Sequence, residues 1–496
     1  MKIKKLLVAN RGEISLRIMR TAKEMGIKTL AIYSEADFTA PHVRFADQAV
    51  CIGPSQASKS YLNQELIIQT AKKFEADAIH PGYGFLSENA GFAQKVKAAG
   101  LVFIGPSPEA ISIMGDKLAA KKAVASFDIP LVPGTTHSVQ DIEEAEKAAS
   151  KIGFPLMIKA SAGGGGKGMR IVHDPADLKE ELARAMGEAK SAFGDPAVFL
   201  EKFIRSPKHV EIQILADQQG NTIHLFDREC SVQRRHQKVI EEAPSPSISP
   251  ETRRAMGQAA IKVAKACDYT GAGTVEFILD NEQHFYFLEM NTRLQVEHPV
   301  TECITGIDLV KAQINIAKGN ALPWSQNDIQ IRGWAMEIRI YAEDPKNQFL
   351  PDTGSLKHFQ KPEGPGVRVD SGYEEGMEIP IYYDPLIAKL IVYGEDRSHT
   401  IAKMKRAIDE FHILGVKNTL SFCGWVMQQQ AFVDSTFTTH FIDQYFKPES
   451  LDKDPDMEEK EAVAFFVSDY LNIPAEKKLP LGSNGLPSKW KRRNNI

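Results

Sequence analysis

Short apolar runs alternate with amphipathic stretches through the first hundred residues, and this alternation restricts the fold more than any other feature of the chain. Residues 5–9 and 29–33 are mostly apolar and suit buried strands. Between them, Ile14 and Ile18 recur at helical spacing within residues 12–25. Further helix and strand patterns follow at 65–73, 78–80, 90–99 and 101–104. Strands that alternate with helices build a parallel sheet of the doubly wound type.

The pattern then changes twice, and each change marks an expected domain boundary. The turn at Gly105-Pro106-Ser107 precedes helical stretches at 108–127 and up to residue 151, the second capped by Ser138 with Asp141. From residue 156 strands predominate, at 156–160, 197–203, 210–216, 222–227, 273–279 and 284–291, with a helix at 252–267. Beyond 319–324, mostly antiparallel strands are expected at 335–341, 355–360, 367–370 and 387–393, with helices at 398–411 and 420–429. The predicted fold class is therefore α/β and α+β.

Composition excludes several classes of protein. The 496 residues are 43% hydrophobic and 25% charged with a net charge of −4, so no basic excess points to nucleic acid. No apolar run approaches the roughly 18 residues of a membrane span, and the N-terminal apolar run is too short for a signal peptide. The five cysteines are dispersed and form no C-x-x-C, which fits a reducing compartment. A cytoplasmic enzyme is expected.

A glycine-rich stretch at 161–168 lies between two predicted strands. Consecutive glycines allow backbone N–H groups to close around phosphate oxygens. Position 168 is Gly where a Walker A loop needs Ser or Thr, and residues 169–172 read as strand. We interpret the stretch as a flexible lid over phosphates, against the alternative of a mobile surface loop. Lys117 and Lys159 could each bring a charge to a phosphate, although either alone is more typical of a surface residue.

Acidic and amide side chains converge across the predicted hairpin that turns at residues 280–282. Glu276 lies in its first strand, and Glu289 and Asn291 lie at i and i+2 in the second, which places these two on one face together with Phe285 and Phe287. Two carboxylates and an amide suit Mg²⁺, which takes oxygen ligands. The alternative is an exposed acidic face.

Directly downstream, Arg293, Gln295 and Glu297 continue the polar alternation. Arg offers a planar fork for a small oxyanion, Gln can orient it, and Glu can take a proton. Two further polar segments are less specific on their own. Residues 228–238 are cationic and also fit a solvated loop, and residues 80–89 form a strand-to-helix turn with two glycines.

Together these motifs resemble biotin carboxylase of the ATP-grasp superfamily. The matching segments are Val8-Ala9-Asn10-Arg11-Gly12-Glu13-Ile14, HPGYGFLSEN at 80–89, GGGGKGMR at 163–170, RECSVQRRHQK at 228–238 and EMNTRLQVEHPVTE at 289–302. The likeness runs from residue 1 to about 446. It implies an N-terminal (pre-ATP-grasp) domain over 1–115, an ATP-grasp domain over 116–330 with a mobile lid at about 131–204, a mostly antiparallel C-terminal domain over 331–446, and a tail over 447–496.

The resemblance also implies roles for individual residues. The expected ATP contacts are Lys117, Lys159, Gly163, Gly164, Gly165, Gly166, Lys167, Gly168, Glu201, Lys202, His209, Gln233 and His236. The expected ligands of two Mg²⁺ or Mn²⁺ ions are Glu276, Glu289 and Asn291, the two glutamates also contacting the nucleotide. The expected bicarbonate pocket is Lys238, Arg293, Gln295 and Val296, with Glu297 as the base. Arg339 is expected to stabilise the biotin enolate, and Tyr83 to lie near the biotin ring.

The implied activity is that of an ATP-dependent C–N ligase that carboxylates biotin N1 through carboxyphosphate. Family carriers place the modified lysine in Met-Lys-Met, and no such triplet occurs here. The expected partners are therefore a separate biotin carboxyl carrier protein, a carboxyltransferase subunit and a second copy of the chain. The resemblance implies the first half-reaction of an acetyl-CoA or propionyl-CoA carboxylase, the former serving fatty acid biosynthesis. It does not specify the acceptor.

The tail departs from the minimal subunit. Phe465, Phe466, Tyr470 and Leu471 could form an amphipathic patch, and residues 488–491 are similar to a segment in the α chains of acyl-CoA carboxylases such as propionyl-CoA carboxylase. Docking to the carboxyltransferase and a disordered tail are the two hypotheses for it.

Three other functions fit the motifs less well. A carbamoyl-phosphate or purine-pathway ligase would share the lid and the hairpin but has no need of the 80–89 turn or of RLQVEHPVTE. A dinucleotide-dependent oxidoreductase needs G-x-G-x-x-G, whereas the first turn holds only Gly12. A non-catalytic homologue would have lost Glu297, Arg293 or the metal carboxylates, and all are present.

Overall fold

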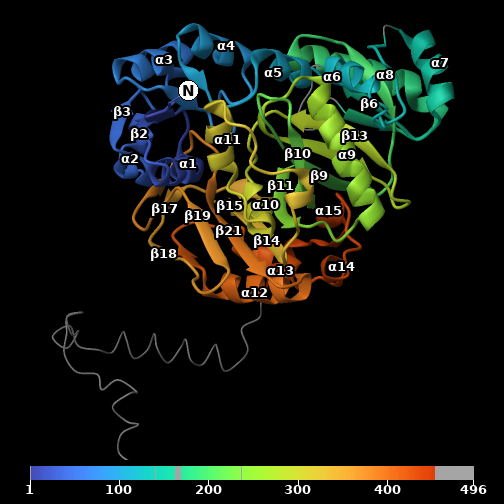
Figure 1. The fold of residues 1–496 in the computed structure, drawn as a ribbon. Helices are drawn as coiled ribbons and strands as arrows, with labels where there is room; N and C mark the ends of the chain where they lie inside the picture. Colours follow the sequence, from blue (N-terminus) through green and yellow to red (C-terminus); the bar gives the residue numbers. More distant parts are fainter. Residues whose placement is uncertain (1, 140, 162–168, 236, 453–496) are drawn as a thin grey trace, which may run out of the picture. The chain divides into compact units, whose positions relative to one another are not determined.

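The computed structural model describes residues 2–139, 141–161, 169–235 and 237–452, which Figure 1 draws in colour. The chain divides into two units, Met1–Pro448 and Glu449–Ile496, and the sheets formed by the described residues belong to the first. Several predictions fall outside the described residues: Gly163, Gly164, Gly165, Gly166, Lys167, Gly168, His236 and the docking patch of the tail. No described helix has the length and apolarity that crossing a membrane requires.

The expected parallel sheet is present at the N-terminus, with its five strands in the order β3-β2-β1-β4-β5. The strands are β1 (Lys5–Val8), β2 (Lys28–Tyr33), β3 (Gln48–Cys51), β4 (Ala78–His80) and β5 (Val102–Phe103). The helices are α1 (Gly12–Glu24), α2 (Pro41–Phe45), α3 (Gln64–Lys73), α4 (Ala90–Ala98) and α5 (Pro108–Gly115). Leu6 packs with α1 on one face, and Leu7 packs with α3 and α4 on the other. Burial of both faces explains why β1 is apolar from Leu6 onward.

An eight-stranded antiparallel sheet forms the centre of the unit, in the order β13-β12-β9-β10-β11-β14-β21-β19. Its strands are β9 (Lys208–Ala216), β10 (Thr222–Arg234), β11 (Gln237–Ala243), β12 (Gly271–Leu279), β13 (Phe285–Asn291), β14 (Trp334–Tyr341), β19 (Val367–Ser371) and β21 (Leu386–Gly394). Because β11 pairs with β14, the sheet continues without interruption across residue 330, where a domain boundary was expected.

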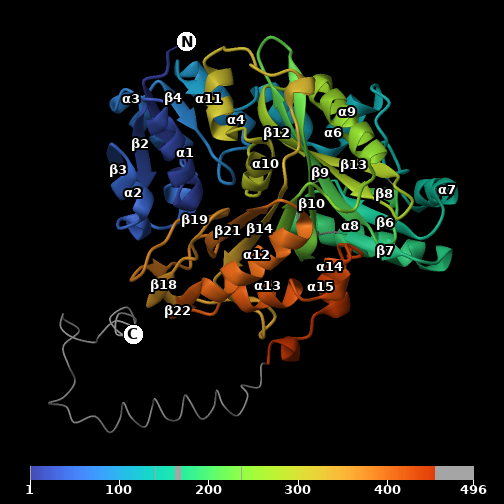
Figure 2. The ribbon, with the colours of Figure 1, turned by 60° about the horizontal axis from the view of Figure 1, so that its bottom comes forward.

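The two faces of this sheet differ in chemistry. Along β9, Val210, Ile212 and Ile214 pack into an apolar core with α9 (Pro250–Ala266), which Figure 1 shows against β9 and β10. Farther along, α12 (Arg397–Glu410) packs against β14 and β21 (Figure 2). In β9 itself, the alternate residues His209 and Glu211 point to the opposite, polar face of the sheet. Strict alternation of side chains thus gives one sheet both a core and a site.

A smaller antiparallel sheet, in the order β7-β6-β8, immediately precedes the central sheet in the sequence. It comprises β6 (Leu156–Ala160), β7 (Met169–Val172) and β8 (Val198–Lys202), covered by α7 (Ile142–Ile152) and α8 (Leu178–Phe193). As predicted, residues 161–168 connect two strands, which pair as β6 and β7. The predicted helix cap was misplaced: Asp141, not Ser138, is the N-cap of α7, and its side chain accepts from the Glu144 N–H.

The remaining elements complete the unit. The other helices are α6 (Lys117–Ala125), α10 (His298–Thr305), α11 (Leu309–Ala317), α13 (Leu420–Val426), α14 (Gln430–Val433) and α15 (Phe441–Tyr445). Three two-stranded ladders pair β15 (Glu343–Asp344) with β16 (Leu350–Pro351), β17 (Gly354–Ser355) with β20 (Glu378–Ile379), and β18 (His358–Gln360) with β22 (His412–Leu414).

Candidate active site

A cavity of about 490 Å³ lies between the polar face of the central sheet, the small sheet and α6. Most of the residues predicted to act together line it: Lys117, Lys159, Glu201, Lys202, His209, Gln233, Lys238, Glu276, Glu289, Asn291, Arg293, Gln295, Val296, Glu297 and Arg339. Tyr83 is not among the lining residues. It is half-buried, and its hydroxyl donates to a Glu13 carboxylate oxygen.

Part of the cavity wall is apolar, which sequence reasoning missed. The apolar lining side chains include Met157, Met169, Phe203, Ile278 and Leu288. They come from both sheets, so no local pattern in the sequence joins them. An apolar slot that adjoins a charged region suits a ligand with a flat ring and an anionic end.

Glu297 is the most constrained carboxylate of the cavity. It immediately precedes α10, is almost fully buried, and lies 2.7 Å from Lys238 Nζ and 2.9 Å from Arg339 Nη2. Burial alone would raise the pKa of this carboxyl, but the charges of Lys238 and Arg339 outweigh burial and hold it well below its usual range. The side chain is therefore an anion at neutral pH, as a general base must be.

Glu276 and Glu289 face the cavity from the two strands of the hairpin. Glu276 lies 2.8 Å from Lys238 Nζ and accepts from Asn291 and Gln295, each at 2.8 Å. Within the described ranges, the Glu289 carboxylate forms no hydrogen bond or ion pair. Burial and the neighbouring charge of Glu276 raise its pKa. A divalent cation would relieve that repulsion, so the donor set of two carboxylates and an amide oxygen fits Mg²⁺ or Mn²⁺.

The hairpin departs from the predicted alternation. Glu276 pairs with Glu289 but Phe277 pairs with Phe287, so Leu288 is an extra residue in β13, a β-bulge. The prediction that Phe285 and Phe287 share the face of Glu289 was therefore wrong. Phe285 and Phe287 pair with Leu279 and Phe277 and pack with the apolar core, and Phe287 also borders the cavity. The bulge re-aims the strand so that a core residue and a cavity residue lie two positions apart.

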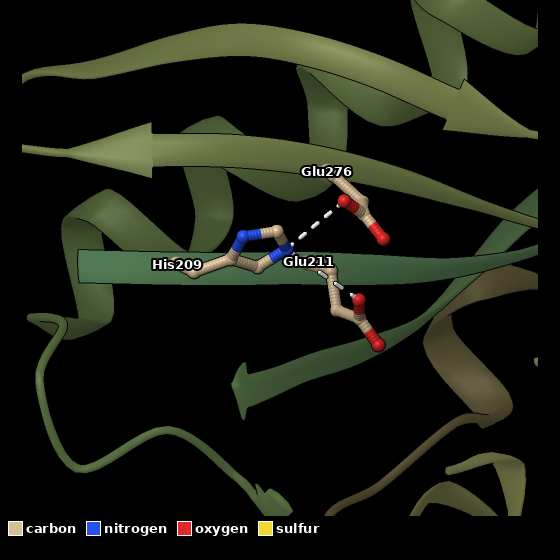
Figure 3. A group of neighbouring side chains, drawn as sticks. All are labelled: His209, Glu211 and Glu276. Carbon is tan, nitrogen blue, oxygen red and sulfur yellow. Dashed lines mark ion pairs between the residues drawn. The ribbon is translucent and has the colours of Figure 1, made fainter. Parts of the chain in front are cut away.

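His209 and Glu211 extend from β9 toward Glu276, as Figure 3 shows. His209 Nε2 lies 3.0 Å from a Glu276 oxygen and 3.9 Å from a Glu211 oxygen. Burial alone would lower the pKa of His209, but the negative charge of Glu276 outweighs burial and raises it. Glu211 is also paired with a second cation, since Lys238 Nζ donates a hydrogen bond to it. Cations already neutralise these carboxylates, so we read the trio as an ion-pair network. Glu211 was missed; its i+2 position from His209 was the available signal.

Arg228 is the second residue that the sequence did not single out by itself. It was expected in a segment that also fits a solvated loop, but 228–234 belongs to β10 and 237–238 to β11, and the Arg228 side chain is fully buried. Its guanidinium lies 2.5 Å from Glu211 and donates to Gln295 Oε1 at 2.7 Å. Arg228 is polar because it belongs to a buried hydrogen-bond network on the polar face of the sheet.

In another part of the cavity, two lysines pair with one carboxylate and a third lysine lies nearby. Lys159 Nζ lies 2.5 Å from Glu201, and Lys121 also pairs with it. Lys117 lines the same end, and burial lowers its pKa despite the nearby charge of Glu289. Lys202 turns elsewhere and donates to the Phe154 carbonyl at 3.1 Å. The positive charges of Lys117, Lys121 and Lys159 outnumber the single negative charge of Glu201, so this part of the cavity can bind an anionic ligand.

Arg293 links the hairpin to the N-terminal region. Its Nε donates to Glu88 at 2.8 Å, and its Nη2 donates to the Asn291 side-chain oxygen at 2.9 Å. Glu88 belongs to the 80–89 turn, so that turn contacts the site through charge rather than through its glycines. Arg234 also has a partner, since Nη2 lies 2.7 Å from Glu343.

Comparison with known proteins covers nearly the whole described chain. Family models match in sequence order: "Biotin carboxylase, N-terminal domain" at residues 2–111, "Carbamoyl-phosphate synthase L chain, ATP binding domain" at 116–325 and "Biotin carboxylase C-terminal domain" at 337–444. Biotin carboxylase 1 of Bacillus subtilis is 52% identical over 444 residues, covering 89% of this chain and 99% of that protein.

A longer relative and a solved structure agree. The human mitochondrial propionyl-CoA carboxylase alpha chain is 52% identical over 89% of this chain, which spans 61% of its length. The biotin carboxylase domain dimer of the Hydrogenobacter thermophilus 2-oxoglutarate carboxylase, in complex with MgADP, ADP and bicarbonate, has a TM-score of 0.86 at 46% identity. The structural match covers 92% of this chain and 100% of the solved domain. The chain belongs to the biotin carboxylase family.

Proposed function

We propose that this chain uses ATP and bicarbonate to carboxylate N1 of biotin on a separate carrier protein. The observation that carries the proposal is the position of Glu297 between Lys238 and Arg339. This places an ionised base beside two fixed cations at the wall of the cavity. Bicarbonate bound by Lys238, Arg293 and the Gln295-Val296 segment would lose its proton to Glu297 and attack the γ-phosphate of ATP.

The nucleotide occupies the rest of the cavity in this proposal. Its adenine suits the slot that includes Met157, Met169 and Leu288, and its phosphates lie toward Lys117 and Lys159. The 163–168 lid, Glu201, Lys202, His209, Gln233 and His236 complete the proposed contacts. Glu276, Glu289 and Asn291 hold the metal, which when bound neutralises triphosphate charge during phosphoryl transfer.

The second step takes place at the Arg339 end. Carboxyphosphate, formed by attack on ATP, breaks down to CO₂ and phosphate, and this phosphate takes the N1 proton of biotin. The Arg339 guanidinium is fixed by Glu297 at 2.9 Å and by Glu241 at 2.7 Å, so it can stabilise the enolate oxygen without reorganising. Tyr83, which lies outside the cavity lining, is proposed to approach the biotin ring.

The final acceptor belongs to a partner. The human relative is a propionyl-CoA carboxylase chain, and the solved neighbour is a domain of a 2-oxoglutarate carboxylase. We propose an acyl-CoA carboxylase, acting on acetyl-CoA or propionyl-CoA, with a carrier protein, a carboxyltransferase and a second copy of this chain as partners. The dimer in the neighbour's description supports the last. A reducing cytoplasm is consistent with five unbridged cysteines.

The test is phosphate release from MgATP with and without bicarbonate and biotin. The expected result is bicarbonate-dependent release that biotin stimulates, reduced by at least about 100-fold in Glu297→Gln because a general base is removed. Glu282→Gln, at the exposed tip of the metal hairpin, is the control and keeps wild-type rates. Release that depends on bicarbonate but ignores both biotin and a biotinyl carrier would assign the chain to another bicarbonate-activating ligase.

A further inference from the structure

A buried lysine behind the cavity has no part in the proposed chemistry. Lys389 in β21 is fully buried, although an isolated ammonium is strongly disfavoured in a protein interior. Its Nζ donates to the Val296 carbonyl at 2.7 Å and lies 3.2 Å from a Glu13 oxygen. Asp370 is farther, at 4.0 Å. The ammonium is thus paired, and its hydrogen bond goes to the backbone of the proposed bicarbonate pocket.

Lys389 and Arg339 act on consecutive residues. The two are directly opposite each other in the β14–β21 pairing, so their side chains leave the same face of the sheet. Arg339 contacts the Glu297 carboxylate, and Lys389 contacts the carbonyl of the residue before it. On the other side of Val296, Gln295 is fixed by Arg228 and Glu276. Lys389 therefore supplies the contact that orients the Val296 peptide.

The anion that pairs with Lys389 comes from the other end of the sequence. Glu13 lies in the first turn of α1, and the Tyr83 hydroxyl donates to the oxygen that also faces Lys389. Close packing holds α1 there, since a Cβ at Gly372 would lie 2.7 Å from the Gly12 Cα. This gives the N-terminal motif around Glu13 a role in the site, although none of its side chains lines the cavity.

We propose that Lys389 is a positioning residue for bicarbonate and that Glu13 holds its charge in place. The inference rests on the proposed function and deepens it. The buried ammonium fixes the Val296 peptide, and through it the spacing of Gln295 and Glu297 around the small anion. Without it, the segment can rotate away while the nucleotide end, built from the two sheets and α6, is untouched.

The test compares Lys389→Met with Lys403→Met. Methionine keeps the long apolar stem and removes the ammonium. Lys403 is a matched control, because its Nζ also donates to a backbone carbonyl, that of Tyr393, away from the cavity. In Lys389→Met the KM for bicarbonate should rise at least about tenfold, the value expected when a charged hydrogen bond is lost, while the KM for MgATP stays at the wild-type value. Lys403→Met should leave both unchanged.

A purely structural role predicts a different result. Loss of folded enzyme lowers kcat and Tm but leaves the KM for bicarbonate as it was, and that outcome overturns the proposal. If Lys389→Met does not fold, Glu13→Gln replaces it, since this isosteric change removes only the charge. A raised bicarbonate KM supports the proposal, and a wild-type KM overturns it. Absence of bicarbonate-dependent release in the wild type would instead refute the proposed function.

Discussion

Replacing Arg228 by methionine is the most direct test of the buried network beneath the cavity. The side chain is fully buried, and methionine preserves much of its apolar volume. The substitution removes five contacts at once. These are to Glu211 at 2.5 Å, Gln213 and Gln295 at 2.7 Å, and Thr274 and Thr301 at 3.0 Å. Glu211 then keeps only Lys238 as a close cationic partner, with His209 3.9 Å away.

The expected loss of stability follows from the loss of a close cationic partner of the buried Glu211 carboxylate. Removing one partner of a buried ion pair destabilises a protein by about 3–5 kcal/mol, because the other charge stays buried without compensation. The compact unit spans Met1–Pro448. At about 2.1 cal/mol/K per residue, its unfolding entropy is about 0.9 kcal/mol/K. The melting temperature should therefore fall by about 3–5 °C.

The measurement is differential scanning calorimetry of the wild type, Arg228→Met and Arg406→Met. Arg406 pairs with Glu410 on the surface, where both side chains are over 40% exposed, so its loss should change stability by less than about 1 kcal/mol. Arg228→Met should also reduce phosphate release, because Gln295 loses the donor that orients it. A melting temperature within error of the control would refute the account of Arg228 as the centre of a buried charge network.

Three further changes test separate features. Burial raises the pKa of Glu241 to about 7 although Arg339 is near. A carboxyl whose pKa is raised by folding stabilises the protein at low pH, and this stabilisation is lost as the pH rises through the folded-state pKa. Between pH 4.5 and 7 the wild type should therefore lose up to about 3 kcal/mol of stability relative to Glu241→Gln. Parallel curves of Tm against pH for the two proteins would contradict this. Gly372→Ala should destabilise by about 1–3 kcal/mol through its clash with α1, whereas Gly187→Ala, with open space around it, should gain up to about 1 kcal/mol; equal denaturation midpoints would show that the close approach is unimportant. Glu289→Gln should raise the Mg²⁺ concentration for half-maximal phosphate release at least about tenfold, and an unchanged Mg²⁺ titration would remove Glu289 from the ligand set.

The sequence predicted the parallel sheet and the hairpin because both have strong local patterns. Residues 6–9 are apolar throughout, as a strand buried on both faces must be. The edge strand β3 and helix α2 were missed, since β3 is four residues long and mostly exposed. Residues 228–238 were compatible with a loop because polar residues normally face solvent, whereas Arg228, Gln233 and Lys238 lie in strands of the central sheet and are buried or line the cavity.

The site was predicted unevenly for the same reason. Glu276, Glu289 and Glu297 lie within a short stretch and could be grouped by spacing. The partners that give them their charge states lie far away in sequence: Glu297 is matched with Arg339 from β14, and Glu211 with Arg228 from β10. No single-sequence pattern relates residues on different strands. The Leu288 bulge likewise breaks alternation without any local signal.

The unbroken pairing of β11 with β14 has a consequence for dividing the chain. A fragment that stopped at residue 330 would present β11 as a free edge, with the backbone groups of Ile240, Glu241, Glu242 and Ala243 unpaired. Exposed edges of this kind recruit other chains and aggregate. Chimeras with a related chain should therefore be joined outside the central sheet. A junction between β11 and β14 would take Lys238 and Arg339 from different proteins and require two unmatched strands to pair with each other.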